Sequence, residues 1–450
     1  MSKSKNGRKK IYLLSLGCSR NMVDSEVLGA LLEKKGYDIL DEPHGADVAV
    51  INTCGFIQDA KQESIDLILQ LADLKKQGSI KKLIVCGCLA QRFPSAIADQ
   101  IKEIDGIFGT SDFTLIPDKI DAIFHGDKIH KVTRKPQLLC DHQFKRKTLT
   151  PPHYAYVKIQ EGCSNKCAYC VIPDLRGPLR SRTVKSVLAE VKRLKDERDL
   201  KELVLTGQDT TAFGLERSGS ERISGLLRKL SPLMKDAWIR LLYTHPAHFT
   251  DELLDVMADT EVVCKYIDLP IQHCNNRILR KMNRCVTKEE IVKLIAKLRK
   301  KIPDVTIRTS VIVGFPGETD EEFGELLGFL EETRFDRLGA FIYSREEGTP
   351  AAGFKGQLPE KVKRERFDRV MTLQQGISSE NNRTYLNKRL KTLIDEEDSS
   401  RSGWFIGRAQ MDAPEVDGNI HVHGSGLAAG EFVEVLVTGT SEYDLVGEAV

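Results

Sequence analysis

Short β-branched runs alternate with helical stretches along most of this chain, and this alternation restricts the possible folds more than any other feature. Near the N-terminus the runs are IYLLSL (11–16), DVAVIN (47–52) and KLIVCG (82–87). Continuous apolar runs of this length are typical of strands buried on both faces of a parallel sheet. Helical patterns over Ser25 to Lys35 and Ile57 to Lys76 separate them. The sequence therefore predicts a doubly wound parallel α/β domain over residues 1–130.

The alternation resumes after residues 131–150, a basic stretch without periodicity that ends at Pro151-Pro152 and is predicted to be an interdomain linker. Six further strand candidates lie at 155–160, 202–207, 238–243, 266–271, 306–315 and 337–344. A complete TIM barrel would need eight βα units. We therefore expect a partial, open TIM-like (βα)6 barrel in a domain that spans residues 151–383, with a polar helical stretch from Pro359 to Leu390 after the last barrel strand.

The C-terminal residues 384–450 differ from the rest in pattern and in charge. Short β-like pieces at Phe405–Ala409, Asn419–His423, Glu431–Val437 and Tyr443–Val450 are separated by Gly, Asp and Ser. This pattern predicts a small, OB-like β-barrel. The region carries five Lys+Arg and twelve Asp+Glu, a net charge of −7, whereas the whole chain carries +2, so the remainder carries +9.

The composition excludes several classes of protein and makes the cysteines the leading question. Hydrophobic residues make up 41% and charged residues 29% of the chain, which excludes disordered and fibrous classes. No apolar run approaches the ~20 residues that span a bilayer, and the basic segment MSKSKNGRKK leads into no signal-peptide core. We expect a cytoplasmic protein. In that reducing compartment its eleven cysteines favour metal or redox chemistry over disulfides.

Three cysteines, Cys163, Cys167 and Cys170, occur in EGCSNKCAYC directly after the first predicted barrel strand. Thiolates at spacings of four and three residues can turn inward on one loop, which suits a cubane iron–sulfur cluster. Three ligands leave one of four irons open to another molecule. A zinc knuckle is the alternative, but structural zinc takes four ligands. His153 or a distant cysteine would then have to supply the fourth.

A second set of cysteines is dispersed in sequence. Cys18, Cys54 and Cys88 each follow one of the first three predicted strands, and they are separated by 36 and 34 residues. Ligand sites of open α/β sheets form outside the carboxyl ends of the strands, where these residues converge. One such cysteine alone would be a small buried hydrophobe, but three at equivalent positions predict a ligand set. Cys86 lies within a strand and is predicted to be core, and Cys140, Cys264, Cys274 and Cys285 are given no role.

The barrel cysteines, with Tyr169 before the last of them, resemble the radical S-adenosylmethionine (SAM) superfamily, as do LTGQD (205–209) and IVGFPGET (312–319). The resemblance implies a 4Fe–4S cluster on Cys163, Cys167 and Cys170 whose open iron chelates the cofactor. It also places Tyr169 and Gly207 among the SAM-binding residues.

The three domains together resemble the radical SAM methylthiotransferase family, with a TRAM domain at the C-terminus. This resemblance implies a second 4Fe–4S cluster, on Cys18, Cys54 and Cys88, which holds or donates sulfur. It also implies that two SAM molecules are spent per turnover, one for the methyl group and one for the radical. A low-potential electron donor such as flavodoxin or ferredoxin would be a partner.

Several stretches are similar to the branch of this family that modifies the β-carbon of an aspartate of small-subunit ribosomal protein S-twelve. They are 151–173, GQDTTAFG (207–214), 269–284, YSREEGTPAA (343–352) and MDAPEVDGNI (411–420). Two residues depart from the pattern of this branch: Tyr169, where phenylalanine is frequent, and Gly207, where alanine is expected. Neither is a predicted iron ligand. The residues assign no catalytic side chain.

The acidic terminal domain favours a basic protein substrate over RNA. A net charge of −7 repels phosphates, whereas ribosomal proteins are generally basic. Asp412, Glu415 and Asp417 are predicted to belong to the docking surface. Three alternatives stay open: acidic residues that serve only solubility, a tRNA adenosine methylthiotransferase that contacts RNA through the basic linker and barrel loops, and a non-catalytic zinc- or cluster-bearing binding protein.

Overall fold

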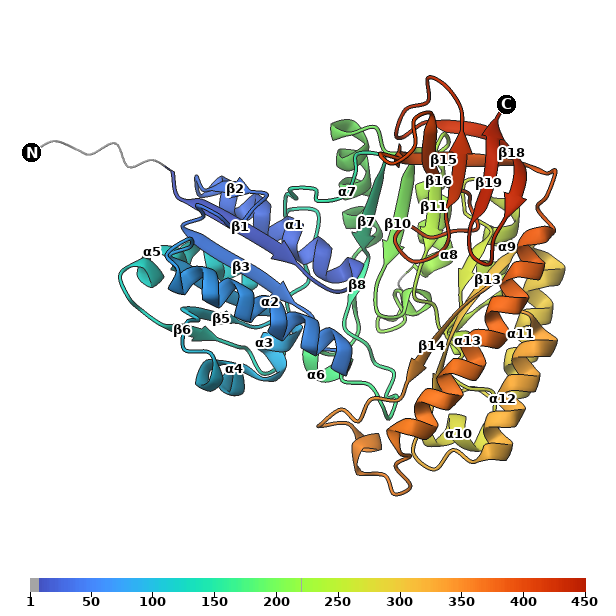
Figure 1. Cartoon of the computed structure of the whole chain (residues 1–450), viewed down its shortest axis with the longest axis horizontal. Coiled ribbons are helices and arrows are strands. Elements are labelled where there is room, and N and C mark those ends of the chain that lie inside the picture. The colour runs from blue at the N-terminus through green and yellow to red at the C-terminus, as the bar shows by residue number, and fades with distance from the viewer. Residues whose placement is uncertain (1–7, 220) are drawn as a thin grey trace, which may run out of the picture. The chain divides into compact units, whose positions relative to one another are not determined.

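The structure is a computed structural model that describes residues 8–219 and 221–450, so most of the basic N-terminal segment lies outside the described residues. The chain divides into two compact units (Figure 1). Unit 1 contains Met1–Leu149, Gln160–Ser164 and Cys170–Arg182, and unit 2 contains Thr150–Ile159, Asn165–Tyr169 and Thr183–Val450. Among the described helices, none combines the length and apolarity needed to cross a membrane.

Unit 1 is built on a parallel sheet with the strand order β2-β1-β3-β4-β5-β6. Its strands are β1 (Lys10–Ser15), β2 (Asp38–Leu40), β3 (Val48–Thr53), β4 (Lys82–Gly87), β5 (Gly106–Phe108) and β6 (Ile129–Lys131). Its helices are α1 (Ser19–Lys34), α2 (Gln58–Lys76), α3 (Cys88–Arg92), α4 (Pro94–Gln100), α5 (Ile116–Phe124) and α6 (Ile172–Arg176). A short antiparallel pair, β8 (Gln160–Glu161) and β9 (Arg180–Ser181), completes the unit.

Helices cover both faces of this sheet, which confirms the predicted doubly wound domain. In β3, Ala49 and Ile51 belong to the core that α2 covers, whereas Val48 and Val50 belong to the core that α1 and α5 cover. Alternate residues of a strand point to opposite faces, so a strand that is buried on both sides is apolar throughout. Cys86 lies fully buried in the second of these cores, as predicted.

The basic stretch 131–150 packs against α1. The backbone N–H of Lys147 donates to the Glu26 carbonyl at 2.9 Å, and the N–H of Leu149 donates to a Glu26 carboxylate oxygen at 2.8 Å. The Arg146 side chain is buried and forms an ion pair with the same carboxylate. At least this arginine of the segment is therefore used within unit 1 and is not presented to RNA.

Unit 2 begins with the predicted partial barrel of parallel strands. The strands are β7 (Tyr154–Lys158), β10 (Glu202–Thr206), β11 (Trp238–Leu241), β12 (Tyr266–Asp268), β13 (Thr306–Val313) and β14 (Arg337–Ile342), hydrogen-bonded in the orders β11-β10-β7 and β12-β13-β14. The helices are α7 (Val184–Glu197), α8 (Ile223–Leu230), α9 (Asp251–Asp259), α10 (Asn276–Lys281), α11 (Lys288–Lys301), α12 (Asp320–Thr333) and α13 (Glu360–Arg383). Short 3₁₀ turns of unit 2 lie at Thr210–Ala212, Ser231–Leu233, Pro246–His248 and Pro350–Gly353, and unit 1 has one at Phe113–Leu115.

The C-terminal region of unit 2 is a closed β-barrel in the order β15-β16-β17-β19-β18, as predicted. Its strands are β15 (Arg389–Glu397), β16 (Trp404–Arg408), β17 (Ile420–His423), β18 (Phe432–Thr440) and β19 (Leu445–Ala449). Strand β15 was not expected, because its charged residues resemble the end of the preceding helix. It pairs with both β16 and β18, and so closes the barrel.

Buried ion pairs join this terminal barrel to the partial barrel within unit 2. Glu202 on β10 accepts from Arg240 Nε at 2.6 Å and from Arg408 Nη1 at 2.7 Å. Arg408 also donates twice to Asp395, whose other contact is His153 Nε2 at 2.8 Å. His153 is therefore part of this interface and does not serve as a fourth ligand for the barrel cysteines.

Two of the acidic residues predicted to form a docking surface, Asp412 and Asp417, belong to this interface, and that prediction is wrong for them. For the exposed Glu415 it stays a prediction. Asp412 is buried and accepts from Arg337 Nη2 at 2.8 Å. Asp417 accepts from the Tyr266 hydroxyl at 2.6 Å, and it also pairs with Arg308. Glu415, though exposed, accepts from the Tyr154 hydroxyl at 2.7 Å. A charge count cannot distinguish carboxylates that face solvent from those that neutralise arginines of a neighbouring domain.

Candidate functional site

Cys18, Cys54 and Cys88 lie at one edge of the sheet of unit 1. Cys18 precedes α1, Cys54 follows β3, and Cys88 is the first residue of α3. The preceding strands β1, β3 and β4 are parallel neighbours, so their carboxyl ends meet at this edge. The structure thus brings together residues that are far apart in sequence, as predicted.

Glycines next to two of these cysteines permit the close approach. Gly87 has a φ of +93°, and a Cβ there would lie 2.2 Å from Asn52 Oδ1 and 2.6 Å from the Thr53 carbonyl. At Gly17, with a φ of +86°, a Cβ would lie 2.8 Å from the Cβ of Cys54. Any other residue at either position would push the adjacent cysteine away from the sheet edge.

The three thiols lie close enough to affect one another's ionisation. Burial raises the pKa of Cys54 to about 11, and the neighbouring Cys88 and Cys18 contribute to the increase. Burial likewise raises the pKa of Cys88. Burial also acts to raise the pKa of Cys18, but Arg20, Arg176 and two backbone N–H groups outweigh it and leave that pKa below its ordinary value. All eleven cysteines lie among the described residues, and no disulfide joins any of them.

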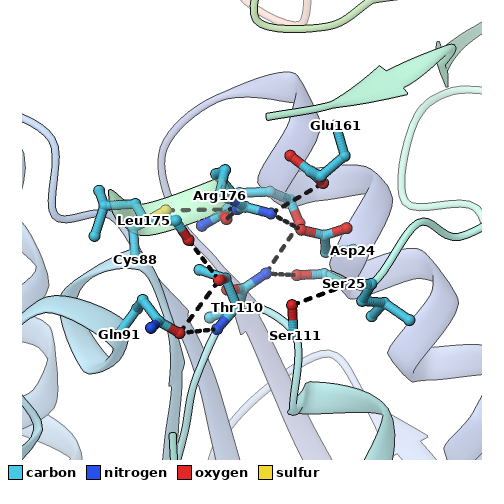
Figure 2. Close-up of polar contacts among 12 residues, drawn as sticks. Asp24, Ser25, Cys88, Gln91, Thr110, Ser111, Glu161, Leu175 and Arg176 are labelled. Atoms are coloured by element: carbon cyan, nitrogen blue, oxygen red, sulfur yellow. Dashed lines mark hydrogen bonds and ion pairs between the residues drawn. The ribbon is translucent and has the colours of Figure 1, made fainter. Parts of the chain in front are cut away.

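A buried arginine, Arg176 at the end of α6, lies against this set of cysteines (Figure 2). Its Nη1 donates to Asp24 Oδ2 at 2.5 Å and lies 3.4 Å from Glu161 Oε2. Its Nη2 donates to Asn21 Oδ1 at 2.6 Å and to the Cys88 sulfur at 3.5 Å. The positive charge is therefore placed directly beside one of the candidate ligands.

The segment that carries Arg176 is fixed to the same sheet edge. The Thr110 hydroxyl donates to the Leu175 carbonyl at 2.6 Å, and Gln91 Oε1 accepts from the Thr110 backbone N–H at 3.0 Å (Figure 2). The side chain of Leu175 packs against Val171 and Cys88. These contacts hold α6 in place next to α3.

The second set of cysteines lies on the loop after β8. In unit 2, the Ala168 N–H donates to the Met282 carbonyl at 2.8 Å, and Asn283 Nδ2 donates to the Lys166 carbonyl at 2.6 Å. The backbone on both sides of Cys167 is therefore fixed, and Tyr169 packs onto the apolar cluster that contains Phe315.

The cysteines on either side of Cys167 group with unit 1. The Cys163 N–H donates to the Gly177 carbonyl at 3.1 Å, and Cys170 belongs to the same unit. Boundaries of the predicted domains at 130, 150 and 383 stay predictions, since the two compact units cut across this loop.

A buried arginine also accompanies these cysteines. Arg284 follows α10, and its Nη1 lies 3.9 Å from the Cys167 sulfur while its Nη2 donates to the Pro270 carbonyl at 2.6 Å. Its Nε is buried and has no hydrogen-bond partner in the described part of the chain. The site thus holds a cation with one unused donor, which is suited to a carboxylate ligand.

Polar residues gather beyond the ends of β10 and β11. Gly207 follows β10 directly, and two residues later Asp209 Oδ2 accepts from Asn165 Nδ2 and from His248 Nδ1, each at 2.7 Å. Burial lowers the pKa of His245 to about 3, and Arg284 contributes. Within residues 8–219 and 221–450, Asp209, His245 and His248 are the one group of three possible ligands whose atoms all lie within 4.8 Å. The Thr211 hydroxyl occupies the other oxygen of Asp209, so the group is a hydrogen-bonded carboxylate–imidazole pair.

Sequence reasoning missed these polar residues because their roles depend on tertiary contacts. Arg176 lies six residues after Cys170, and this fixed offset from a ligand motif is the one local signal that could have drawn attention to it. Arg284 and His248 carry no comparable signal.

Three family models match consecutive parts of the chain. The Radical SAM superfamily matches residues 157–330, Uncharacterized protein family UPF0004 matches residues 10–109, and the TRAM domain matches residues 388–450. The first and third correspond to the partial barrel and the closed terminal barrel of unit 2.

Similar proteins cover the chain almost completely. The ribosomal protein uS12 methylthiotransferase RimO of Pelotomaculum thermopropionicum is 45% identical over 98% of this chain and 99% of its own length. The protein of the same name from Heliobacterium modesticaldum is 46% identical over 98% of this chain and 95% of its own. The radical SAM methyltransferase TsrM of Kitasatospora setae shares the fold with a TM-score of 0.60, at 14% identity over 82% of this chain and 89% of its own. The chain therefore belongs to the ribosomal protein uS12 methylthiotransferase family of radical SAM enzymes.

Proposed function

We propose that this enzyme attaches a methylthio group to the β-carbon of an aspartate in ribosomal protein uS12. The relatives that bear the name of this activity match the chain over nearly its full length. The observation that carries the proposal is the presence of two separate three-cysteine sets, one at the sheet edge of unit 1 and one on the loop after β8. Two separate sites suit a reaction that needs both a radical and a source of sulfur.

Cys163, Cys167 and Cys170 are proposed to hold the cluster that binds SAM. Cysteine thiolates are the usual ligands of 4Fe–4S clusters, and three of them leave one iron for the cofactor. Hydrogen bonds to Met282 and Asn283 fix the loop around Cys167. Tyr169 and Gly207 are proposed to contact the cofactor.

Cys18, Cys54 and Cys88 are proposed to hold the second cluster. A tetrahedral zinc ion with Zn–S bonds of about 2.3 Å would bring its sulfurs to about 3.8 Å from one another. The three thiols are not among the described groups whose ligand atoms lie within 4.8 Å. This wider spacing supports a cluster, which has four metal ions, over a single zinc ion at this sheet edge. Cys86 belongs to the core and supplies no fourth thiol.

When bound, SAM and the clusters supply the electron, radical, methyl group and sulfur that the reaction consumes. The chain's own residues set the environment for this chemistry. Arg284 offers its buried Nε to a carboxylate beside Cys167. Asp209 orients His248 through a 2.7 Å hydrogen bond. Burial keeps His245 neutral, so it adds no positive charge beside Arg284.

The enzyme is proposed to act in the cytoplasm, where reduced cysteines persist. A low-potential donor such as flavodoxin or ferredoxin is proposed to deliver electrons. The substrate would be uS12, either free or within the small ribosomal subunit.

The test is anaerobic turnover followed by mass spectrometry. The reconstituted enzyme is incubated with dithionite, SAM and either uS12, the assembled small subunit or bulk tRNA. We expect uS12 to gain the mass of one methylthio group on an aspartate. Methylthiolated adenosine in tRNA, with unmodified uS12, would instead establish the tRNA activity.

Cysteine variants separate the two sites. Alanine at Cys163, Cys167 and Cys170 should abolish formation of 5′-deoxyadenosine and leave about half of the iron. Alanine at Cys18, Cys54 and Cys88 should preserve that cleavage but stop product formation. Cys285→Ala, at an exposed cysteine, is the matched control and should change neither readout. Loss of all iron from either folded triple variant would contradict the two-site assignment.

A further inference from the structure

Arg176 is a buried charge for which the proposed reaction supplies no role. Its side chain is only 4% exposed, and the two terminal nitrogens of its guanidinium contact different kinds of partner. Nη1 faces the carboxylates of Asp24 and Glu161, and Nη2 faces the sulfur of Cys88 (Figure 2). Nη2 also donates to Asn21 Oδ1. The two carboxylates compensate the buried charge, and Nη2 is left to donate to the sulfur of Cys88.

We infer that Arg176 is a positioning residue that sets the reduction potential of the cluster held by Cys18, Cys54 and Cys88. This inference rests on the proposed function, because it assumes that Cys88 is a cluster ligand. Donors aimed at ligand sulfurs, together with nearby charge, are the means by which proteins tune such potentials. A reduced cluster is more negative by one charge than an oxidised cluster, so a cation beside its ligand favours reduction.

Asp24 acts on the same cluster in the opposite sense. It lies 2.5 Å from Nη1, so it fixes the planar guanidinium in the orientation that presents Nη2 to Cys88. It also places a negative charge next to the cation and thereby offsets part of its effect. Glu161, at 3.4 Å, adds a weaker contribution of the same sign.

These opposed charges predict shifts of opposite sign. Arg176→Met removes the cation and the donor to sulfur, and should lower the potential. Asp24→Asn keeps the shape of the side chain but removes a negative charge, and should raise it. Arg176→Lys retains the charge and should stay near the wild-type value. A purely structural role, in which either substitution loosens the site and admits water, would move both potentials in the same direction.

The experiment is a dithionite titration of the full chain followed by electron paramagnetic resonance. It uses the variant with alanine at Cys163, Cys167 and Cys170, so that the cluster of unit 1 alone contributes the signal. We expect Arg176→Met to change the ratio of reduced to oxidised cluster at a fixed potential by about tenfold or more. For a one-electron couple, a tenfold change equals about 59 mV. Asp24→Asn should change the same ratio in the other direction.

Two measurements keep the outcomes distinct. Iron content is determined first, and a folded parent variant that holds no iron would overturn the ligand assignment and this inference with it. If iron is retained but Arg176→Met leaves the potential unchanged, or shifts it in the same direction as Asp24→Asn, the inference alone is wrong. If Arg176→Met does not fold, Asp24→Asn decides: a raised potential supports the inference, and an unchanged or lowered one refutes it. None of these readouts requires uS12, so failure to modify uS12 would count against the proposed function only.

Discussion

Replacing Glu202 by glutamine should weaken the attachment of the terminal β-barrel to the partial barrel of unit 2. Glu202 is fully buried, and its carboxylate accepts from Arg240 Nε at 2.6 Å and from Arg408 Nη1 at 2.7 Å. Glutamine has nearly the same shape but no charge. The substitution therefore leaves two buried guanidiniums with one carboxylate fewer and opens no cavity.

The structure indicates how large the effect should be. Removing one partner of a buried ion pair costs about 3–5 kcal/mol. Arg408 keeps its two hydrogen bonds to Asp395, at 2.7 and 2.9 Å. Arg240 has no such second carboxylate among its described contacts, and retains the Gln410 carbonyl and the ring of Tyr266. We therefore expect a loss in the upper half of that range, about 4–5 kcal/mol.

The two tryptophans of the chain make this loss measurable. Trp238 on β11 lies 4.8 Å, between ring centroids, from Phe432 on β18, and Trp404 belongs to the terminal barrel itself. Urea unfolding followed by tryptophan fluorescence thus reports on the interface between the barrels. Glu252→Gln is the matched control, because its ion pair with Arg228 is half exposed and water screens it, so its loss should barely move the urea midpoint.

Two outcomes would refute this reasoning. Glu202→Gln and Glu252→Gln could shift the urea midpoint equally, which would mean that burial of the carboxylate has no special cost. Alternatively, adding Arg240→Met to Glu202→Gln could destabilise unit 2 by the full sum of the single effects. Because the double variant removes the uncompensated charge, we expect it to lose less than that sum.

Two further perturbations test the site and the core. Gly87→Ala should lower the iron content of the unit 1 site, because a Cβ there would collide with Asn52 and Thr53 next to Cys88. Gly78→Ala is the control: its φ is similar, a Cβ there would meet no atom within 4 Å, and the iron should be retained. Burial lowers the pKa of His273 to about 4 in the folded chain, whereas the ordinary pKa of histidine is about 6.5. Between pH 6.5 and 4 the unfolded chain therefore binds a proton that the folded chain does not bind. Stability should therefore fall between pH 6.5 and 4, by at most about 3 kcal/mol, and His273→Asn should flatten that part of the pH profile measured by urea unfolding.

Short β-like pieces separated by Gly, Asp and Ser were sufficient to predict the terminal barrel. The alternation of strands and helices was sufficient to predict the partial barrel and the unit 1 sheet, because long buried strands are largely apolar. The same rule failed for β2, β5 and β6, which have only three residues each and too little pattern to detect. It also failed for β15, where Arg389, Lys391, Asp395, Glu396 and Glu397 resemble a helix end. Pairing with β16 and β18 forms that strand, and such pairing is not visible locally.

Some residues of the candidate site could likewise be predicted from the sequence, and others could not. Cys18, Cys54 and Cys88 could be predicted to converge because parallel strands end at one edge, a rule that needs no knowledge of side-chain contacts. Arg176 could not be assigned, because its partners Asp24 and Cys88 lie 152 and 88 residues away. The convergence of ligands follows from topology, whereas the charge placed beside them follows from the path of α6.

The net charge of the terminal barrel does not reveal which of its carboxylates face solvent. The contacts of these carboxylates lead to a prediction opposite to the separable docking domain that the charge count favours. If that barrel were a separable docking module, its removal would leave the partial barrel and SAM cleavage intact. In the structure, Asp412 instead pairs with Arg337, and Asp417 pairs with Arg308 and accepts a hydrogen bond from Tyr266, all within unit 2.

We expect a chain that ends at residue 383 to unfold at lower urea concentration, because truncation leaves the arginines of β13 and β14 without these partners. It should also form less 5′-deoxyadenosine from SAM, since the strands that the terminal barrel covers are the strands that carry the barrel site. Trp238 fluorescence and 5′-deoxyadenosine yield provide the two measurements. A truncated chain with the wild-type urea midpoint and wild-type cleavage would show that the ion pairs carry no stability and that the terminal barrel is a docking module after all.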